Sequence, residues 1–108
     1  MFYALLDPTQ GSEQAGTRPV IIVSRDAINH NISVVICVPV TDLANCNKVY
    51  PSQILLKRGC GGLKVDSVAM GEQIRAITVD RLKDKIGELD RQSLAELGKR
   101  LKIALDVD

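Results

Sequence analysis

Apolar residues along this chain fall in short blocks separated by polar stretches, a pattern typical of β-strands joined by loops. Residues 2–6 and 19–23 form two such blocks, and residues 33–41 form a third that contains one proline. Because Pro39 cannot donate a backbone hydrogen bond, it predicts an edge position or a bulge for that strand. The polar stretches between the blocks are expected to be loops or turns, and they cover residues 7–18, 26–31 and 42–51.

The second half of the chain predicts further strands and then one helix. Residues 53–57 indicate a short strand, and residues 64–77 alternate without a cleanly apolar side, which predicts a long strand that bends near Gly71. A further short strand is expected at residues 85–89. Four leucines are spaced to lie on one face of a C-terminal helix capped by Asp90, and they are expected to pack against the sheet as core: Leu94, Leu97, Leu101 and Leu105.

Several short strands followed by one helix predict a small, curved, mostly antiparallel β-sheet or partial barrel, in a single domain over residues 1–108. One helix cannot cover both faces of such a sheet, so a second apolar face is expected to be available for dimerisation. The longest apolar run, residues 34–38, is too short to cross a membrane. The N-terminus lacks a basic region and a cleavage site, so the expected location is the cytoplasm.

Composition and charge limit the chemistry that this chain can perform. The formal net charge of +1 is low for a protein that binds nucleic acid through a broad basic surface, so such binding is expected only at a small local site. The three cysteines form no C-x-x-C pair and the only histidine lies close to none of them, which disfavours a zinc site or a redox role. The chain also lacks a P-loop, a Ser-His-Asp set and acidic residues spaced for magnesium, so no cofactor or metal is expected.

Two polar residues at strand ends remain as candidates for a functional site. Arg18 leads into one apolar strand and Thr41 ends the next. If these strands pair antiparallel through the turn at residues 26–31, both residues fall at the same end of the hairpin. An arginine presents a planar fork of donors that matches a phosphate, and a threonine hydroxyl can donate one more bond. The pattern permits an anion site, although a surface arginine near a strand-end threonine explains the same residues.

Three stretches of the sequence resemble the MazF/PemK family of toxin endoribonucleases, which are also called mRNA interferases. They are DPTQGSEQAGTRPVIIVS at residues 7–24, VPVT at residues 38–41 and GLKVDSVAMGEQIRAITVDRLKDKIGELD at residues 62–90. The resemblance implies a small SH3-like antiparallel β-barrel with a C-terminal helix, usually as a homodimer. It also implies inhibition by a cognate antitoxin, whose disordered segment lies across the RNA groove and the dimer surface.

The activity that the resemblance implies is metal-independent cleavage of single-stranded RNA or mRNA at short sequences. The 2′-OH of the RNA would attack the adjacent phosphate, leaving a 2′,3′-cyclic phosphate and a 5′-OH. Arg18 and Thr41 match the catalytic residues of the family. Arg18 would bind the scissile phosphate, a role that suits a side chain that stays charged at neutral pH. Thr41 would donate a hydrogen bond to a non-bridging oxygen.

Other positions match the part of the family that contacts RNA. Ser12, Glu13 and Gln14 match a loop that folds over the substrate, and Gln73 matches a position that faces it, with Glu72 beside it. No base for the 2′-OH is evident, and Glu13 and Glu72 are the two candidates. The choice of cleavage sequence is expected to come from the loops that contain residues 7–17 and 42–51.

The chain departs from the PemK-type branch, which carries a histidine at the position of Ser12, an arginine at Met70 and an aspartate at Glu72. The acid–base set of that branch is therefore incomplete here, which favours the catalytic roles of Arg18 and Thr41. Gly71 stands where apolar residues are common in the family.

Two other functions fit the same fold. One is a protein that binds and poisons DNA gyrase, as the CcdB branch does, but that branch relies on a C-terminal Trp-Gly-Ile and this chain has no tryptophan. The other is an inactive toxin that only binds its antitoxin, which the presence of Arg18, Thr41 and the GSEQ loop disfavours.

Overall fold

The computed structural model describes residues 1–6, 16–24 and 33–106, so the predicted turn at residues 26–31 lies outside the described residues, as does most of the predicted loop at residues 7–18. In the described part of the chain, seven strands form one sheet and a helix follows it. The elements are β1 (Phe2–Leu6), β2 (Gly16–Ile22), β3 (Val34–Asp42), β4 (Gln53–Leu56), β5 (Ser67–Met70), β6 (Arg75–Thr78), β7 (Leu82–Lys85) and α2 (Arg91–Leu105).

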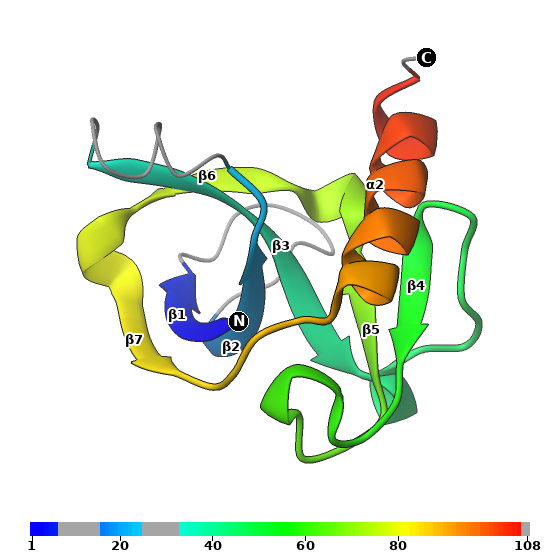
Figure 1. The fold of residues 1–108 in the computed structure, drawn as a ribbon, viewed down its shortest axis with the longest axis horizontal. Coiled ribbons are helices and arrows are strands. Elements are labelled where there is room, and N and C mark those ends of the chain that lie inside the picture. Colours follow the sequence, from blue (N-terminus) through cyan, green and yellow to red (C-terminus); the bar gives the residue numbers. More distant parts are fainter. Residues whose placement is uncertain (7–15, 25–32, 107–108) are drawn as a thin grey trace.

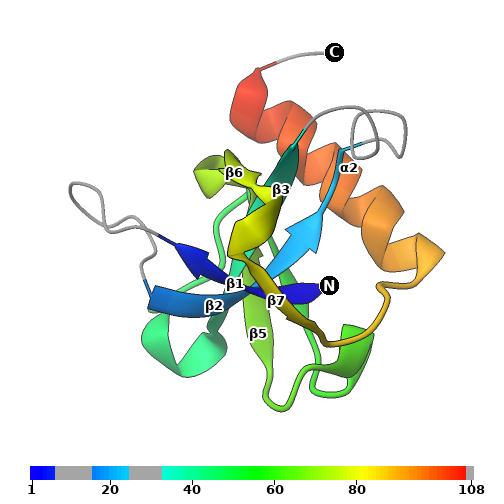
Figure 2. The ribbon, with the colours of Figure 1, turned by 90° about the vertical axis from the view of Figure 1, so that its left-hand side faces the viewer.

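The sheet is antiparallel and strongly curved. Its strand order is β4-β5-β3-β2-β1-β7, with β6 pairing with β3, and each of these pairs runs antiparallel. In Figure 1 the sheet curls from β7 through β1, β2 and β3, while α2 lies beside β4 and β5 at the other end. Figure 2 shows β1, β2 and β7 in front, with α2 behind them. The prediction of a curved antiparallel sheet with one C-terminal helix is confirmed.

β3 is the central strand, because it pairs along both of its edges. One edge pairs with β2, with Val20 opposite Pro39 and Ile22 opposite Cys37. The other edge pairs with β6 as far as Cys37 and then with β5 from Val40 onward. Of the two alternatives predicted for Pro39, the edge position is wrong, whereas the bulge agrees with the three extra residues that the facing chain has at this point. The proline is tolerated because it falls where β3 changes partner, so its missing N–H interrupts no ladder on that edge.

The long strand predicted at residues 64–77 bends at Gly71, as expected. A 3₁₀ turn, η3 (Gly71–Gln73), separates β5 from β6. Between the pairs Val40–Ala69 and Cys37–Arg75, β3 advances by three residues while the facing chain advances by six. The three residues of η3 account for the difference, so they leave the β-ladder.

Two strand boundaries differ from the sequence-based prediction. β2 begins at Gly16, and Arg18 pairs with Ala4 of β1, so the arginine lies within the strand rather than in the loop before it. The last strand is β7, which lies before most of the residues predicted at 85–89. Both shifts reflect pairing with β1, a long-range contact that local composition does not reveal.

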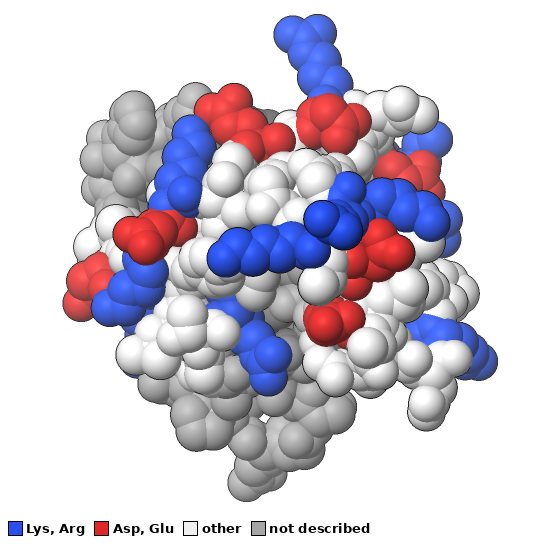
Figure 3. Space-filling view, turned by 90° about the horizontal axis from the view of Figure 1, so that it is seen from below, with Lys and Arg blue, Asp and Glu red and all other residues white. Residues whose placement is uncertain are grey.

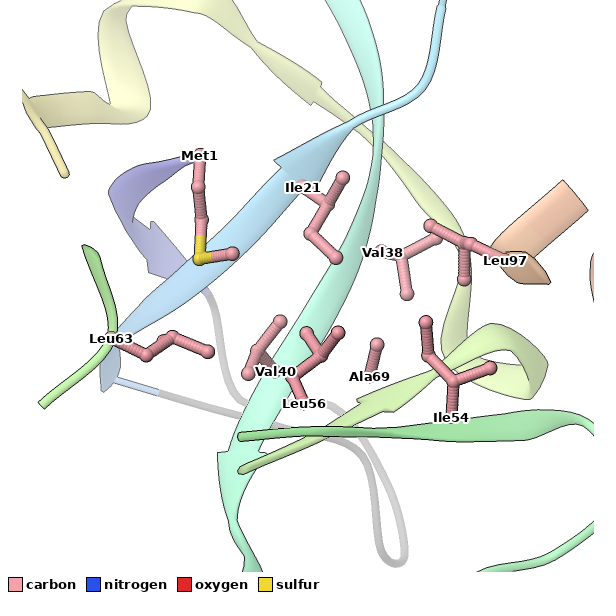
Figure 4. Close-up of a cluster of buried hydrophobic side chains, with 9 residues drawn as sticks. All are labelled: Met1, Ile21, Val38, Val40, Ile54, Leu56, Leu63, Ala69 and Leu97. Atoms are coloured by element: carbon pink, nitrogen blue, oxygen red, sulfur yellow. The ribbon is translucent and has the colours of Figure 1, made fainter. Parts of the chain in front are cut away.

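The two faces of β2 and β3 bury separate hydrophobic clusters, which explains why both strands are apolar at successive positions. One cluster lies between the sheet and α2, and Figure 4 shows Leu97 of the helix pointing into it, toward Val38 and Ile54. The other joins β1, β2, β3 and β6 on the opposite face. Its buried members are Ala4, Leu6, Val20, Val35, Cys37 and Ile77.

The leucine stripe of α2 is buried only in its middle. Asp90 caps the first turn, as predicted. Leu97 is 1% exposed and Leu101 packs against the same cluster, but Leu94 and Leu105 are 41% and 53% exposed. The predicted core packing is wrong for both ends, because the fifteen-residue helix rests mainly on η3 and the four-residue strand β4. The helix therefore keeps apolar side chains at its surface.

Candidate active site

Three of the predicted site residues line one cleft. Thr41 comes from β3, and Glu72 and Gln73 come from η3; the cleft has a volume of about 230 Å³. Most of its opposite wall comes from the segment between β3 and β4. The remaining lining residues are Asn45, Cys46, Asn47, Lys48, Tyr50, Gln53 and Met70. The cleft thus joins residues 41–53 of the chain with residues 70–73.

The predicted loop over the RNA lies outside the described residues, and it comprises Ser12, Glu13 and Gln14. Arg18 is described and half-buried on β2, and it is not among the residues that line the cleft.

Thr41 occupies the floor of the cleft. It is paired with Val68 of β5 and is 6% exposed. Immediately after it, Asp42 caps the 3₁₀ turn η1 (Leu43–Asn45), because its Oδ1 accepts a hydrogen bond from Ala44 N at 2.9 Å. This turn carries Asn45 back toward the strand, with Asn45 Nδ2 at 3.5 Å from Thr41 Oγ1. Pairing with β5 therefore holds Thr41 in place, and the turn η1 brings the side-chain amide of Asn45 close to the Thr41 hydroxyl.

The pairing of β2 with β3 shows which face of the sheet carries Arg18 and which carries Thr41. On β2 and β3, Val20 lies opposite Pro39. The β2–β3 ladder ends at this pair, and Arg18 and Thr41 each lie two residues beyond it on their own strands. Because cross-strand partners share a face of the sheet, as do residues two apart on one strand, the two side chains belong to the same face.

That face is the one opposite the helix. Val40 belongs to the cluster beneath α2, and successive residues of a strand point to opposite faces. Thr41 therefore points away from α2. The cleft and the helix lie on different sides of the sheet, so the helix does not cover the cleft.

Glu72 is tied to the start of β4. Its Oε1 accepts a hydrogen bond from Ser52 Oγ at 3.1 Å, and its Oε2 accepts one from Gln53 Nε2 at 2.7 Å. Both carboxylate oxygens thus have donors that come from one segment. This arrangement suits a group that holds η3 against β4, and Gln73 follows directly on the same turn.

A positive charge, side-chain amides and an aromatic ring line the cleft. Lys48 Nζ lies 4.7 Å from the centroid of the Tyr50 ring, a cation–π contact that keeps a positive charge at the cleft wall. Side-chain amides can bind base edges, and an aromatic ring can stack on a base. On the face seen in Figure 3, basic and acidic side chains are interleaved. Among the described residues, this face therefore carries no broad basic patch.

Sequence reasoning missed Gln53. It is 7% exposed and lies at the first position of a short strand, where a polar residue carries no distinctive pattern. Lys48 and Tyr50 belong to the loop at residues 42–51, which is expected to contribute specificity, but no spacing singles them out. Their juxtaposition with η3 arises only when β4 pairs with β5.

Burial disfavours a catalytic role for the thiol of Cys37. Desolvation raises the pKa of the Cys37 thiol to about 11, although Arg75 partly opposes this shift. A thiol that remains protonated is a poor nucleophile, so Cys37 serves packing.

Across residues 1–6, 16–24 and 33–106, no three His, Cys, Asp or Glu side chains come close enough to hold a metal ion. Over the same residues, no helix is long and apolar enough to cross a membrane.

Comparisons with known proteins agree with this architecture. The family described as "PemK-like, MazF-like toxin of type II toxin-antitoxin system" matches residues 1–105. The chain is 43% identical over 107 residues to endoribonuclease MazF9 of Mycobacterium tuberculosis, covering 94% of this chain and 89% of that protein.

Two solved structures have the same fold. One is the Mycobacterium tuberculosis toxin MazF-mt6, with a TM-score of 0.82 at 23% identity, over 99% of this chain and 96% of that one. The other is a mycobacterial endoribonuclease in complex with its cognate antitoxin, with a TM-score of 0.80 at 20% identity, over 99% and 91% of the two chains. From the match over residues 1–105 and the 43% identity, the chain belongs to the PemK-like, MazF-like toxins of type II toxin–antitoxin systems.

Proposed function

We propose that this protein is a sequence-specific endoribonuclease that cleaves single-stranded RNA without a metal ion. The observation that supports the proposal is that Arg18 and Thr41 lie on neighbouring strands and share a face of the sheet, and that Thr41 lines the cleft. A guanidinium beside a hydroxyl forms a phosphate site, and the adjoining amides and aromatic ring suit unpaired bases. The 43% identity to an endoribonuclease supports the same activity.

In the proposed reaction, the 2′-oxygen of one nucleotide attacks the adjacent phosphorus and loses its proton. The bond from phosphorus to the 5′-oxygen of the next nucleotide breaks, and that oxygen gains a proton. The products are a 2′,3′-cyclic phosphate and a 5′-OH. Arg18 stabilises the negative charge that builds up on the phosphoryl oxygens, and Thr41 donates a hydrogen bond to one of them.

Glu72 is poorly placed to act as the general base for the 2′-OH. Both oxygens of that carboxylate already accept hydrogen bonds from Ser52 and Gln53. A base must be able to approach the proton it removes, and this carboxylate is held toward β4. Glu13, the other candidate, lies outside the described residues.

We further propose that the protein acts as a homodimer neutralised by a cognate antitoxin. For the dimer, support comes from a surface named here the α2-end surface, formed by Tyr50, Pro51, Ile103 and Ala104. Ile103 and Tyr50 are 55% and 50% exposed, and a hollow of about 550 Å³ lies between the helix and Tyr50–Pro51. Exposed apolar side chains gathered in this way are typical of a protein interface. For the antitoxin, support comes from the family to which the chain belongs.

The activity is tested by incubating the purified protein with a long single-stranded RNA in EDTA and mapping the ends of the products. The expected result is a small set of discrete cuts, each with a 2′,3′-cyclic phosphate on one side and a 5′-OH on the other. EDTA removes divalent metals, so the same experiment tests metal independence. Intact RNA after incubation of well-folded protein with diverse RNAs would overturn the proposed activity.

A further inference from the structure

We propose that Gln53 is a positioning residue, which ties the two walls of the cleft together and thereby sets where Gln73 meets the RNA. The inference rests on the proposed RNA-cleaving function, since it assigns a role within the same cleft. Gln53 lines the cleft but is 7% exposed, so its amide acts mainly on the protein around it.

The amide of Gln53 joins the two walls directly. Its Oε1 accepts a hydrogen bond from Tyr50 N at 3.1 Å, and its Nε2 donates to Glu72 Oε2 at 2.7 Å. Tyr50 belongs to the wall before β4, and Glu72 belongs to the wall formed by η3. A single buried side chain therefore spans the cleft from one side to the other, and it bonds a charged group at one end.

The turn η3 packs against α2 and is tied to β4 by hydrogen bonds, one of which comes from Gln53. It is one 3₁₀ turn of three residues, a length at which internal hydrogen bonds alone hold a turn weakly. Its anchors to β4 are Gly71 N donating to Ser52 O at 3.1 Å and the two bonds from Ser52 and Gln53 to Glu72. Gln73 is the next residue of the same turn, so these anchors fix its backbone.

Thr41 does not depend on Gln53 in this way. It is held by its place in β3 and by pairing with Val68 of β5. Loss of the Gln53 amide should therefore move the wall that carries Gln73 while the floor that carries Thr41 stays in place. The expected kinetic signature is weaker RNA binding with little change in the chemical step.

The test compares three variants in steady-state cleavage of one RNA substrate, together with the backbone amide signals of Gln73 and Thr41 in nuclear magnetic resonance spectra. Gln53→Met keeps the size of the side chain and removes both hydrogen bonds. The double variant Gln53→Glu with Glu72→Gln exchanges the two groups. Its carboxylate at position 53 can accept from Tyr50 N and from the amide at position 72, whose oxygen still accepts from Ser52. Gln92→Met, on an exposed helical position, is the matched control.

Gln53→Met is expected to raise KM by about tenfold, the scale for losing a hydrogen bond to a charged group, while kcat changes by less than about twofold. The Gln73 amide signal should shift and the Thr41 signal should not. The exchanged double variant should bring KM back to within about threefold of the wild type, and Gln92→Met should match the wild type.

Two results would overturn the inference. One is an unchanged KM in folded Gln53→Met. The other is an exchanged double variant whose Gln73 signal is restored but whose KM is not, because the carboxylate at position 72 would then act on RNA itself. If Gln53→Met does not fold, Glu72→Leu, which removes both acceptors at the exposed end of the same bond, replaces it, and an unchanged KM and Gln73 signal there would overturn the inference equally. Absence of cleavage by the wild type would refute the proposed activity instead, and the Gln73 signal alone would then decide the role of Gln53.

Discussion

Gly71 lets η3 approach the backbone of β4 more closely than a residue with a Cβ could. A Cβ placed at Gly71 would lie 2.4 Å from Ser52 O and 3.4 Å from Leu101 Cδ2. The first contact is with backbone, which cannot rotate away as a side-chain end can. In the same place Gly71 N donates to Ser52 O. The direct packing of the turn on the start of β4 therefore explains the glycine at position 71.

Replacement of two glycines by alanine should change stability in opposite directions. Gly71→Ala is expected to lower the free energy of unfolding by about 1–3 kcal/mol, because η3 must move away from Ser52 O. Gly98→Ala is expected to raise it by about 0.5–1 kcal/mol, because Gly98 lies within α2 and a Cβ there meets no atom within 4 Å. Urea unfolding at one fixed protein concentration measures both changes, and a Gly71→Ala protein as stable as the wild type would contradict the close approach.

At the scale of the element, α2 depends on a charged cap. Asp90 Oδ2 accepts a hydrogen bond from Ser93 N at 3.0 Å, which satisfies one of the open N–H groups of the first turn. The hydroxyl of Ser93, and then its N–H, hold the pKa of the Asp90 carboxyl below its ordinary value. The ionised carboxylate of Asp90 therefore stabilises the folded helix more than the protonated carboxyl does.

The cap predicts a pH-dependent loss of stability. Because the pKa of Asp90 is lower in the folded state, its contribution is present above the pKa of the unfolded chain and is lost as pH falls through the folded value. Asp90→Ala should lower Tm at pH 7, and the difference from the wild type should shrink below about pH 4. Asp90→Asn keeps a neutral acceptor and serves as the control. A gap in Tm between Asp90→Ala and the wild type that stays constant down to pH 2 would refute this role.

Elements with strong local signals were predictable from the sequence, and features that depend on distant contacts were not. β1, the bend at Gly71 and the Asp90 cap follow from composition and periodicity. The central position of Pro39 depends on two partners of β3 that come from later in the chain. The exposed ends of the leucine stripe depend on how short β4 is, and no helical pattern contains that information.

The candidate site divides in the same way. Arg18 and Thr41 were identified from strand ends and from the resemblance, since both lie in recognisable motifs. Gln53 was missed because its partners are Tyr50 N, a local group, and Glu72, which lies 19 residues away on η3. Such a bond forms only after β4 and β5 pair, so neither spacing nor composition near Gln53 indicates it.

On the scale of the whole molecule, the two proposed surfaces adjoin one another. The cleft lies on the face that points away from α2, whereas the α2-end surface gathers apolar side chains between the helix and Tyr50–Pro51. Tyr50 lines both. The segment before β4 thus connects the proposed RNA site with the proposed dimer surface, and a second copy bound to one would restrict the backbone that forms the other.

Dimerisation through the α2-end surface predicts that one charge placed there separates the subunits. Ile103 is 55% exposed and lines the hollow, so Ile103→Lys should place an ammonium group in a buried, apolar interface. Sedimentation velocity should show a dimer for the wild type and a monomer for the variant at equal concentration. Val79→Lys, on a turn far from this surface and 41% exposed, is the control. A wild type that sediments as a monomer, or an unaffected Ile103→Lys dimer, would contradict this surface.

The central claim is that Arg18 and Thr41 form the phosphate site of an RNA-cleaving enzyme, and the cleavage rate of Arg18→Ala tests it most directly. The rate should be measured in EDTA on an RNA that the wild type cuts, with Arg91→Ala, an exposed arginine at the start of α2, as the control. The expected result is a loss of about 100-fold or more, the scale for removing a donor that stabilises transition-state charge. Folding and dimerisation should be unchanged, and Arg91→Ala should cleave normally. Cleavage by folded Arg18→Ala at the wild-type rate would contradict the claim.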